Sequence, residues 1–276
     1  MNAVAKPDVR SQLLSELRAI RPPLTVIADD EGLKPFETDA LIAHRETPML
    51  AALPETEEQV RAIVLACRTH GVPVVSRGAG TGISGGAIPH PEGVLLVLSK
   101  MRRVLELDPE ARTATVEPGV RNLYVSEVAA PHGLFYAPDP SSQSICSIGG
   151  NVAENAGGVH CLKYGLTTHN ILQVRAVDAD GDVLELGSAA LDAPGYDLLA
   201  LATGSEGLLA LTLEVTVKLL PKPELAQVVM ASFRDVEAAG EAVAGVIGAG
   251  IVPAGLEMME SSRSMRWKTL SARATT

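Results

Sequence analysis

Two glycine-rich motifs constrain this chain more than any other feature of its sequence. The first is SRGAGTGISGG, residues 76–86, and the second is SIGGNVAENAGG, residues 147–158. Glycine has no β-carbon, so both motifs are expected to form loops that bring successive backbone N–H groups against a ligand. One such motif is a weak signal. Two of them, each richer in glycine than a turn requires, point to a large anionic cofactor.

The first motif satisfies the glycine spacing of a Rossmann fingerprint, but its context argues against one. A short apolar strand is expected before it, over residues 72–75, yet a fingerprint also needs a helix that starts at the third glycine. Pro89 and Pro91 would break such a helix, and the next element is an apolar strand expected over residues 94–98. A P-loop is excluded because no Lys-Ser or Lys-Thr pair follows the last glycine. The sequence therefore predicts an extended loop of N–H donors around a diphosphate, without a supporting helix.

Hydrophobic periodicity predicts two helices in the first part of the chain. The N-terminal residues form an amphipathic pattern through Leu13, Leu14, Leu17 and Ile20. A second helix is expected after Thr56 and Gln59, which form a capping-box pattern, and it should end at Gly71. Its apolar face includes Cys67, which we interpret as a small core residue.

Strand signals dominate the middle of the chain. Two hairpins are expected, with strands over residues 104–107 and 113–116 around Asp108-Pro109-Glu110, and over 174–177 and 183–186 around Asp180-Gly181. A longer strand should lie within residues 208–220, before Pro221. The sequence thus predicts helix and short parallel strands first, then an antiparallel sheet.

The pattern changes after Pro221. A strand over residues 228–233, a helix over 236–249 and another strand near Ile251 resemble the opening of a second domain. The last sixteen residues hold four basic side chains and no acidic one, so the preceding 260 carry a net charge of −14. We interpret this tail as the aberrant product of a frameshift or gene interruption, and a short basic native tail is the alternative. We expect residues 222–276 to be poorly soluble, because the apolar face of the helix has no partner sheet.

Composition excludes several classes of function. The net charge of −10 and an aromatic content of 3% disfavour nucleic-acid binding. No apolar run of the roughly 18 residues that a membrane helix needs is present, and the N-terminus lacks the apolar core of a signal peptide. Three cysteines at irregular spacing form neither a disulfide framework nor a zinc motif. The expected location is the reducing cytoplasm.

Several polar turns are expected between the first motif and the long strand. They are Glu117-Pro118-Gly119, the segment 138–142, Lys163-Tyr164-Gly165, and Gly204-Ser205-Glu206-Gly207. Each alone is an ordinary turn, and only their joint order supports a site. His160 and His169 are interpreted as packing or loop residues, because their separation matches no common zinc spacing. Asp139 is interpreted as a turn cap, and Cys146 and Cys161 as free thiols.

These motifs resemble those of FAD-linked oxidases of the vanillyl-alcohol oxidase type and, within them, the flavoprotein subunits of bacterial glycolate oxidases. The matching stretches are PVVSRGAGTGISGGA, YAPDPSSQ, CSIGGNVAENAGGVHCLKYGLT and GSEGLLALTLEVTVKLLPKP. The resemblance covers residues 31–260, and the long second motif makes it specific.

The resemblance implies an α+β chain with a two-lobed FAD-binding domain of the PCMH type. A small parallel-sheet lobe and an antiparallel-sheet lobe with helices would be followed by the start of a truncated cap domain. The expected divisions are a helical segment over 1–46, the FAD-binding domain over 47–222, the beginning of the substrate cap over 223–260 and the aberrant tail over 261–276. By similarity, the residues expected to bind FAD are Arg77, Gly78, Ala79, Gly80, Thr81, Gly82, Gly85, Pro118, Gly119, Pro138, Ser141, Ser142, Gly149, Gly150, Asn151, Ala153, Asn155, Gly158, Tyr164, Glu206 and Gly207.

The implied reaction is oxidation of a 2-hydroxy acid, glycolate or D-lactate, to the 2-oxo acid by hydride transfer to the flavin. No metal is expected, and no catalytic residue is assigned, because relatives carry those groups in the cap and the C-terminal part. The implied partners are a second flavin-type subunit and an iron–sulfur subunit of a glycolate oxidase complex, peripheral to the inner membrane. A catalytically silent FAD-binding fragment is the alternative, and a nicotinamide-dependent Rossmann reductase is disfavoured by the two prolines.

Overall fold

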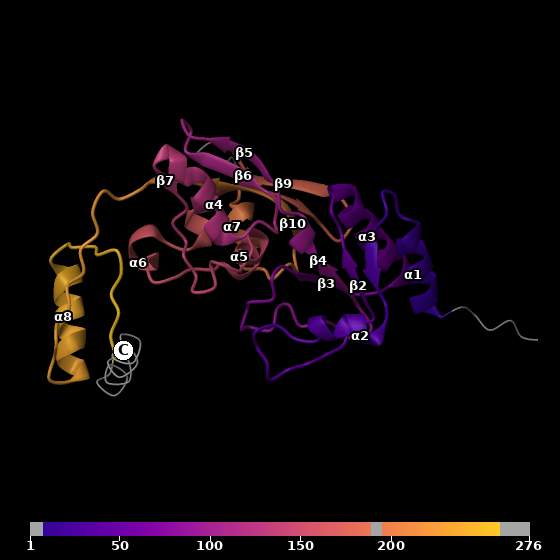
Figure 1. The fold of residues 1–276 in the computed structure, drawn as a ribbon, viewed down its shortest axis with the longest axis horizontal. Helices are drawn as coiled ribbons and strands as arrows, with labels where there is room; N and C mark the ends of the chain where they lie inside the picture. Colours follow the sequence, from indigo (N-terminus) through magenta and orange to yellow (C-terminus); the bar gives the residue numbers. More distant parts are fainter. Residues whose placement is uncertain (1–7, 189–194, 260–276) are drawn as a thin grey trace, which may run out of the picture.

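Two β-sheets, each with its own helices, form the body of the molecule (Figure 1). The computed structural model describes residues 8–188 and 195–259. The first sheet has the strand order β1-β2-β4-β3, and the second has the order β5-β6-β10-β8-β9. This arrangement confirms the α+β, two-lobed fold expected from the sequence.

The first lobe is a mostly parallel sheet covered by two helices. Its strands are β1 (Thr25–Ile27), β2 (Leu50–Leu53), β3 (Val74–Arg77) and β4 (Val94–Val97), and its helical segments are α1 (Val9–Ala19), α2 (Asp30–Leu33), η1 (Lys34–Phe36), α3 (Glu57–His70) and η2 (Leu98–Lys100). Strand β4 runs parallel to β2 and to β3, whereas β1 pairs antiparallel with β2 at the edge. The predicted parallel strands are therefore confirmed, and β1 is an element that the sequence did not suggest.

Helix α3 begins and ends where its sequence predicts. The Thr56 hydroxyl accepts a hydrogen bond from the Gln59 N–H at 3.4 Å, and Gly71 ends the helix in the left-handed conformation. The Gln59 side chain does not close a box onto Thr56. It accepts from the N–H of Glu55 at 2.7 Å and donates to the carbonyl of Pro22 at 3.0 Å. One buried amide thus joins the start of α3 to the segment before β1.

The second lobe is an antiparallel sheet with short helices against it. Its strands are β5 (Val104–Asp108), β6 (Thr113–Val116), β8 (Ile171–Val177), β9 (Val183–Gly187) and β10 (Leu211–Lys218), with the pair β7 (Leu134–Phe135) and β11 (Leu220–Pro221) beside them. The helical segments are α4 (Asn122–Ala129), η3 (Ala130–His132), α5 (Ile148–Glu154), α6 (Cys161–Tyr164), η4 (Thr167–His169) and α7 (Leu198–Ala202). Both predicted hairpins are confirmed, and β10 alternates buried and half-buried residues along its whole length.

An arginine-centred network joins the two lobes. The guanidinium of Arg175 on β8 pairs with Glu57 of α3, and it also reaches Glu185 at 3.0 Å and Glu214 at 3.2 Å. Nearby, Nε of Arg61 donates to the carbonyl of Gly181 at 2.9 Å. These contacts between α3 and the β8–β9 hairpin join the first lobe to the second.

The segment after β11 is an exposed connection followed by helix α8 (Val236–Gly248), which stands apart from the sheets (Figure 1). The helix predicted over residues 236–249 is confirmed. The strands predicted over residues 228–233 and near Ile251 are not formed, so those two predictions are wrong. The side chains of Val228 and Val229 are 95% and 91% exposed. A strand needs a neighbour for its backbone N–H and C=O groups, and in the described part of the chain no strand pairs with this segment. The interpretation of the basic tail concerns residues outside the described ranges.

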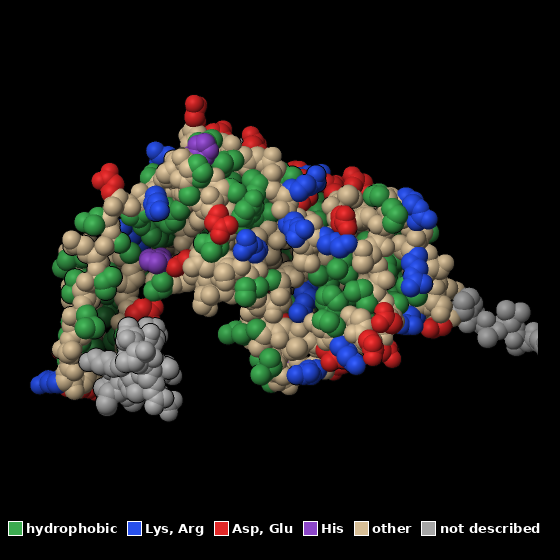
Figure 2. Space-filling model, in the orientation of Figure 1, with side chains coloured by type: hydrophobic (Ala, Val, Ile, Leu, Met, Phe, Trp, Pro, Cys, Tyr) green, Lys and Arg blue, Asp and Glu red, His purple; other side chains and the backbone are tan. Residues whose placement is uncertain are grey.

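Figure 2 shows a hollow on the underside of the molecule, between α8 and the lobe that carries α2.

None of the helices that the structure describes combines the length and the apolar content needed to span a membrane.

Candidate cofactor site

A cavity of about 450 Å³ lies where the two glycine motifs meet. Four segments supply most of its walls: residues 76–84 and 86–87 at the first motif, 146–147 and 149–157 at the second, 202 and 205–207 in the turn before β10, and the loop at 140–142. Pro118, Leu98 and the start of β10 complete the lining. The cavity is therefore built from both lobes.

The first motif is an extended loop between β3 and β4, as the sequence predicts. Its shape depends on Arg77, whose side chain folds back against Gly80 and donates to the carbonyl of Ala87 at 3.4 Å. Burial lowers the pKa of the Arg77 guanidinium, and the negative charge of Asp39 acts in the opposite direction. Arg77 thus contacts the loop at Gly80 and at Ala87, and it adds positive charge to the cavity.

The second motif begins as a helix and not as the loop expected from its glycines, and only residues 155–158 form a turn and loop after it. Residues 148–154 form α5, because the Ser147 hydroxyl accepts from the N–H of Gly150 at 3.3 Å and caps the helix start. Ile148 and Val152 pack in the core of the second lobe, and Asn155 ends the helix in the left-handed conformation. The glycines serve close packing: a β-carbon on Gly149 would lie 2.5 Å from the β-carbon of Pro118.

Most of the residues expected from the resemblance come together in this cavity. They are Arg77, Gly78, Ala79, Gly80, Thr81, Gly82, Pro118, Ser141, Ser142, Gly149, Gly150, Asn151, Ala153, Asn155, Glu206 and Gly207. Their convergence from five separate segments is what a cofactor-binding role requires. Their contacts with a cofactor remain a prediction.

Five expected residues lie outside the lining and have structural roles. A β-carbon on Gly119 would lie 2.5 Å from the carbonyl oxygen of Met101, so this glycine allows a close backbone approach. The carbonyl of Pro138 accepts from Nδ2 of Asn122 at 3.0 Å. Gly158 packs on the backbone of Asp139. The ring of Tyr164 contacts the ring of Phe135 edge-on, with the two ring centroids 5.9 Å apart. Gly85, with φ +90°, forms the turn before Ile88.

Sequence reasoning missed several lining residues. Ser84, Ser147 and Ser205 add hydroxyl groups to the cavity, and Glu154 adds a carboxyl group. Glu154 lies three positions after Asn151, so the two share one face of α5. A helical reading of the second motif would have predicted Glu154 beside Asn151, which the resemblance already indicated.

The residues present fit a polar, anionic cofactor. Asn151 is 2% exposed, and among the described residues its Nδ2 has no hydrogen-bond partner. A buried donor without an acceptor is costly, so this amide is a candidate to meet an acceptor on a ligand. Backbone N–H groups and hydroxyls from both motifs surround it, and Arg77 supplies a positive charge.

Histidine and cysteine side chains near the cavity form local contacts. Nδ1 of His160 lies 2.6 Å from Oδ2 of Asp139, and Nδ1 of His169 accepts from the N–H of Leu166 at 3.1 Å. His169 forms a hydrogen bond within its loop, as expected, whereas His160 contacts a residue 21 positions away in the chain. Asp139 does not cap a turn, because its carboxylate pairs with His160 across the loop.

All three cysteines are free thiols, as expected. Burial raises the pKa of Cys67 to about 12 and also raises the pKa of Cys146, which lines the cavity. Within the ranges that the structure describes, no three His, Cys, Asp or Glu side chains are grouped as a metal site would require.

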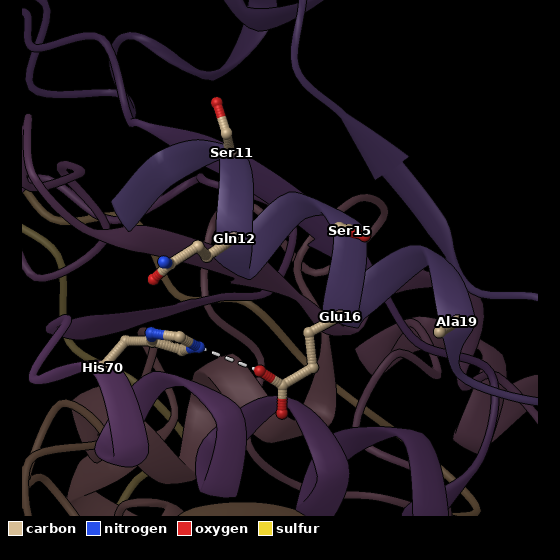
Figure 3. A pocket seen from close by; sticks show the side chains of 6 residues that line it. All are labelled: Ser11, Gln12, Ser15, Glu16, Ala19 and His70. Atoms are coloured by element: carbon tan, nitrogen blue, oxygen red, sulfur yellow. Dashed lines mark hydrogen bonds and ion pairs between the residues drawn. The ribbon is translucent and has the colours of Figure 1, made fainter. Parts of the chain in front are cut away.

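A second, more open groove of about 600 Å³ lies between α1 and α3 (Figure 3). Its lining consists of Ser11, Gln12, Ser15, Glu16, Ala19 and His70. Nε2 of His70 pairs with Oε2 of Glu16 at 2.9 Å. The groove contains no residue of either glycine motif, so the cavity between the motifs is the candidate site.

Comparisons with known proteins agree with this geometry. Residues 48–187 match the family model described as "FAD binding domain", and residues 222–271 match "FAD linked oxidases, C-terminal domain". The chain is 58% identical over 258 residues to "Glycolate oxidase subunit GlcD" of Escherichia coli (strain K12), with 93% of this chain and 52% of that protein covered. It is 36% identical to a "D-lactate dehydrogenase" of Archaeoglobus fulgidus, with 90% and 54% covered.

Among solved structures, alkyldihydroxyacetonephosphate synthase shares the fold, with a TM-score of 0.74 at 22% identity. That match covers 88% of this chain and 46% of the other. The chain spans about half the length of the curated relatives that it matches.

Proposed function

This chain belongs to the FAD-binding-domain family of the FAD-linked oxidases, and on that premise we propose that it is the flavin-binding part of an enzyme that oxidises a 2-hydroxy acid. The substrate class we propose is glycolate or D-lactate, and the product is the corresponding 2-oxo acid. One observation carries the proposal: the two glycine motifs and the turn at Glu206 meet around one cavity. The names of the relatives, a glycolate oxidase subunit and a D-lactate dehydrogenase, support the substrate class.

In this proposal the chain's own residues bind and orient the cofactor. The loop from Arg77 to Gly82 holds the diphosphate through backbone N–H groups, since its glycines leave the backbone accessible. Asn151 donates from its free Nδ2, and the hydroxyls of Ser141 and Ser142 face the same cavity. The bound flavin supplies the hydride acceptor.

The reaction also needs a cation for the substrate carboxylate and a base for the hydroxyl proton. Arg77 donates to the carbonyl of Ala87 within the first motif's loop, so we do not assign it to the substrate. We propose that the FAD-linked oxidase C-terminal domain, whose family model matches residues 222–271, supplies both groups.

A second candidate is an FAD-binding chain without turnover of its own. The observation that favours it is the chemistry of the lining, where the described residues include no histidine.

In the leading proposal, electrons leave through companion subunits, a second flavin-type chain and an iron–sulfur chain. That complex would lie on the cytoplasmic side of the inner membrane, and the word "subunit" in the name of the Escherichia coli relative supports an assembly.

The test is anaerobic reduction of the purified chain loaded with FAD. Addition of glycolate or D-lactate should bleach the flavin absorbance, and L-lactate serves as the matched control. Bleaching by glycolate or D-lactate alone supports the 2-hydroxy-acid oxidase. Flavin bands that persist with all three acids support the second candidate, and a chain that binds no flavin contradicts both.

A further inference from the structure

Two carboxylates from different elements converge on one glycine of the first motif. Glu154 ends α5, and Glu206 lies in the turn between α7 and β10. A β-carbon on Gly86 would lie 2.5 Å from Oε2 of Glu206 and 3.0 Å from Oε1 of Glu154. A β-carbon on Gly82 would lie 3.6 Å from the same Glu154 oxygen. Both acids therefore lie against the loop assigned to the diphosphate, and both line the cavity.

The backbone fixes the position of this acid pair. The N–H of Glu206 donates to the carbonyl of Ala153 at 2.9 Å, and the N–H of Gly204 donates to that of Val152 at 2.8 Å. Glu206 itself has φ +54°, a conformation that a non-glycine residue rarely adopts. Such strain persists only where the surrounding contacts impose it. The turn is thus tied to the last turn of α5, and the two carboxylates cannot easily separate.

The surroundings of Glu154 are predominantly acidic. Glu206 faces it from the turn, Asp39 acts on it from the N-terminal segment, and the Ser84 hydroxyl bonds to it from the first motif. Burial raises the pKa of Glu154 most, the charges of Glu206 and Asp39 raise it further, and the Ser84 hydrogen bond opposes them. The nearby cation, Arg77, donates to the carbonyl of Ala87 and feels the negative charge of Asp39.

We propose that Glu154 binds the cofactor as a neutral carboxyl, taking up a proton as the anionic FAD enters. The inference rests on the proposed function, because it assumes that FAD occupies this cavity. The physical reason is the sum of like charges. A diphosphate on the first motif adds negative charge where two carboxylates already share one partly buried site, and such a site disfavours full ionisation. Protonation of Glu154 removes one of these charges and provides an O–H donor.

Proton uptake on binding has a defined consequence for affinity. The pKa of Glu154 is higher in the loaded protein than in the free one, so low pH favours binding. The dissociation constant for FAD should rise with pH by up to about tenfold per unit between the two pKa values. At pH values below the pKa of Glu154 in the FAD-free protein, the affinity for FAD should not depend on pH.

The experiment titrates FAD into the flavin-stripped full chain across pH 5.5–8.5 and follows flavin fluorescence. Glu154→Gln imitates the neutral carboxyl, so its dissociation constant should vary by less than about twofold across this range. Glu206→Gln removes the neighbouring charge and should extend tight binding to higher pH. Glu110→Gln, in the exposed β5–β6 turn, is the matched control and should follow the unaltered chain. Calorimetry in two buffers of different ionisation enthalpy should show proton uptake that E154Q lacks.

The outcomes separate the inference from the proposed function. FAD binding whose affinity does not change with pH, or a pH dependence that survives in E154Q and E206Q alike, overturns the inference and leaves the proposed function intact. A chain that binds no FAD at any pH overturns both.

Discussion

Gly78 lies directly against the side chain of Ser147, so closely that a β-carbon at Gly78 would overlap the Ser147 hydroxyl oxygen. The same β-carbon would lie 3.7 Å from the backbone nitrogen of Gly150. This contact joins the two glycine motifs, because Gly78 belongs to the first and Ser147 caps the helix of the second. The shape of the cavity depends on it.

Gly78→Ala should weaken both the fold and the site. The added methyl group must displace the Ser147 hydroxyl, and loss of the helix cap costs about 1 kcal/mol of unfolding free energy. The two motifs should also move apart and weaken FAD binding. Denaturant unfolding and FAD titration measure the two effects.

A double-mutant cycle checks the cause. In a Ser147→Ala background the overlapping oxygen is absent, so Gly78→Ala should cost clearly less than it does alone. Gly240→Ala is the control, since among the described residues nothing lies within 4 Å of its added β-carbon. It should leave FAD binding unchanged, and equal costs of Gly78→Ala in both backgrounds would contradict the account.

Asn151→Ala should separate cofactor binding from stability. Removal of a buried donor that lacks an acceptor should cost the cofactor-free protein little, while FAD affinity falls about three- to tenfold for one lost hydrogen bond. Thermal unfolding with and without FAD measures both. Asn122→Ala is the matched control, because its Nδ2 donates to the Pro138 carbonyl. It should show the reverse pattern, and a large loss of stability in cofactor-free Asn151→Ala would refute the assignment.

The features predicted correctly from the sequence are those that depend on local interactions. The Thr56 cap, the Gly71 stop and the two hairpins each depend on residues close together in the chain, and all are present. The two prolines after the first motif also act locally, since they exclude a helix whatever the rest of the chain does.

The features predicted incorrectly depend on distant partners. Residues 228–233 have strand-forming side chains, but no described strand lies beside them, so they stay extended and exposed. Residues 148–154 of the second motif are helical, and Ile148 and Val152 pack in a core formed with distant parts of the chain, which the glycines of the motif do not reveal. The Asp139–His160 pair and the approach of Glu154 to Glu206 arise from the tertiary fold and have no local signal.

Thiol labelling should follow burial. Burial raises the pKa of Cys67 and of Cys146, which favours the protonated thiol, whereas the thiolate is the reactive form. Iodoacetamide at pH 8 should therefore modify Cys161, which is partly exposed, well before the other two. The unfolded chain, in which all three should react, is the control. Rapid native labelling of Cys67 would show that the first lobe is not packed as described.

Proteolysis should cut the chain first between β11 and α8. The Arg234 side chain is 87% exposed, and its neighbours in residues 223–235 are outside any regular element. Brief trypsin treatment should release the helix and leave a large fragment that still binds FAD. Mass spectrometry identifies the cut, and earlier cleavage within the sheets, or loss of flavin with the released helix, would contradict the described separation.

The most direct test of whether the cavity between the two glycine motifs binds FAD is the amount of flavin that the purified chain holds. After incubation with excess FAD and gel filtration, the absorbance of the denatured sample gives the ratio of flavin to chain. We expect about one FAD per chain, as one cavity implies, and lower values for Gly78→Ala and Asn151→Ala. A chain that retains no FAD, or that retains it equally well in both variants, would show that the cavity between the two glycine motifs is not the flavin site.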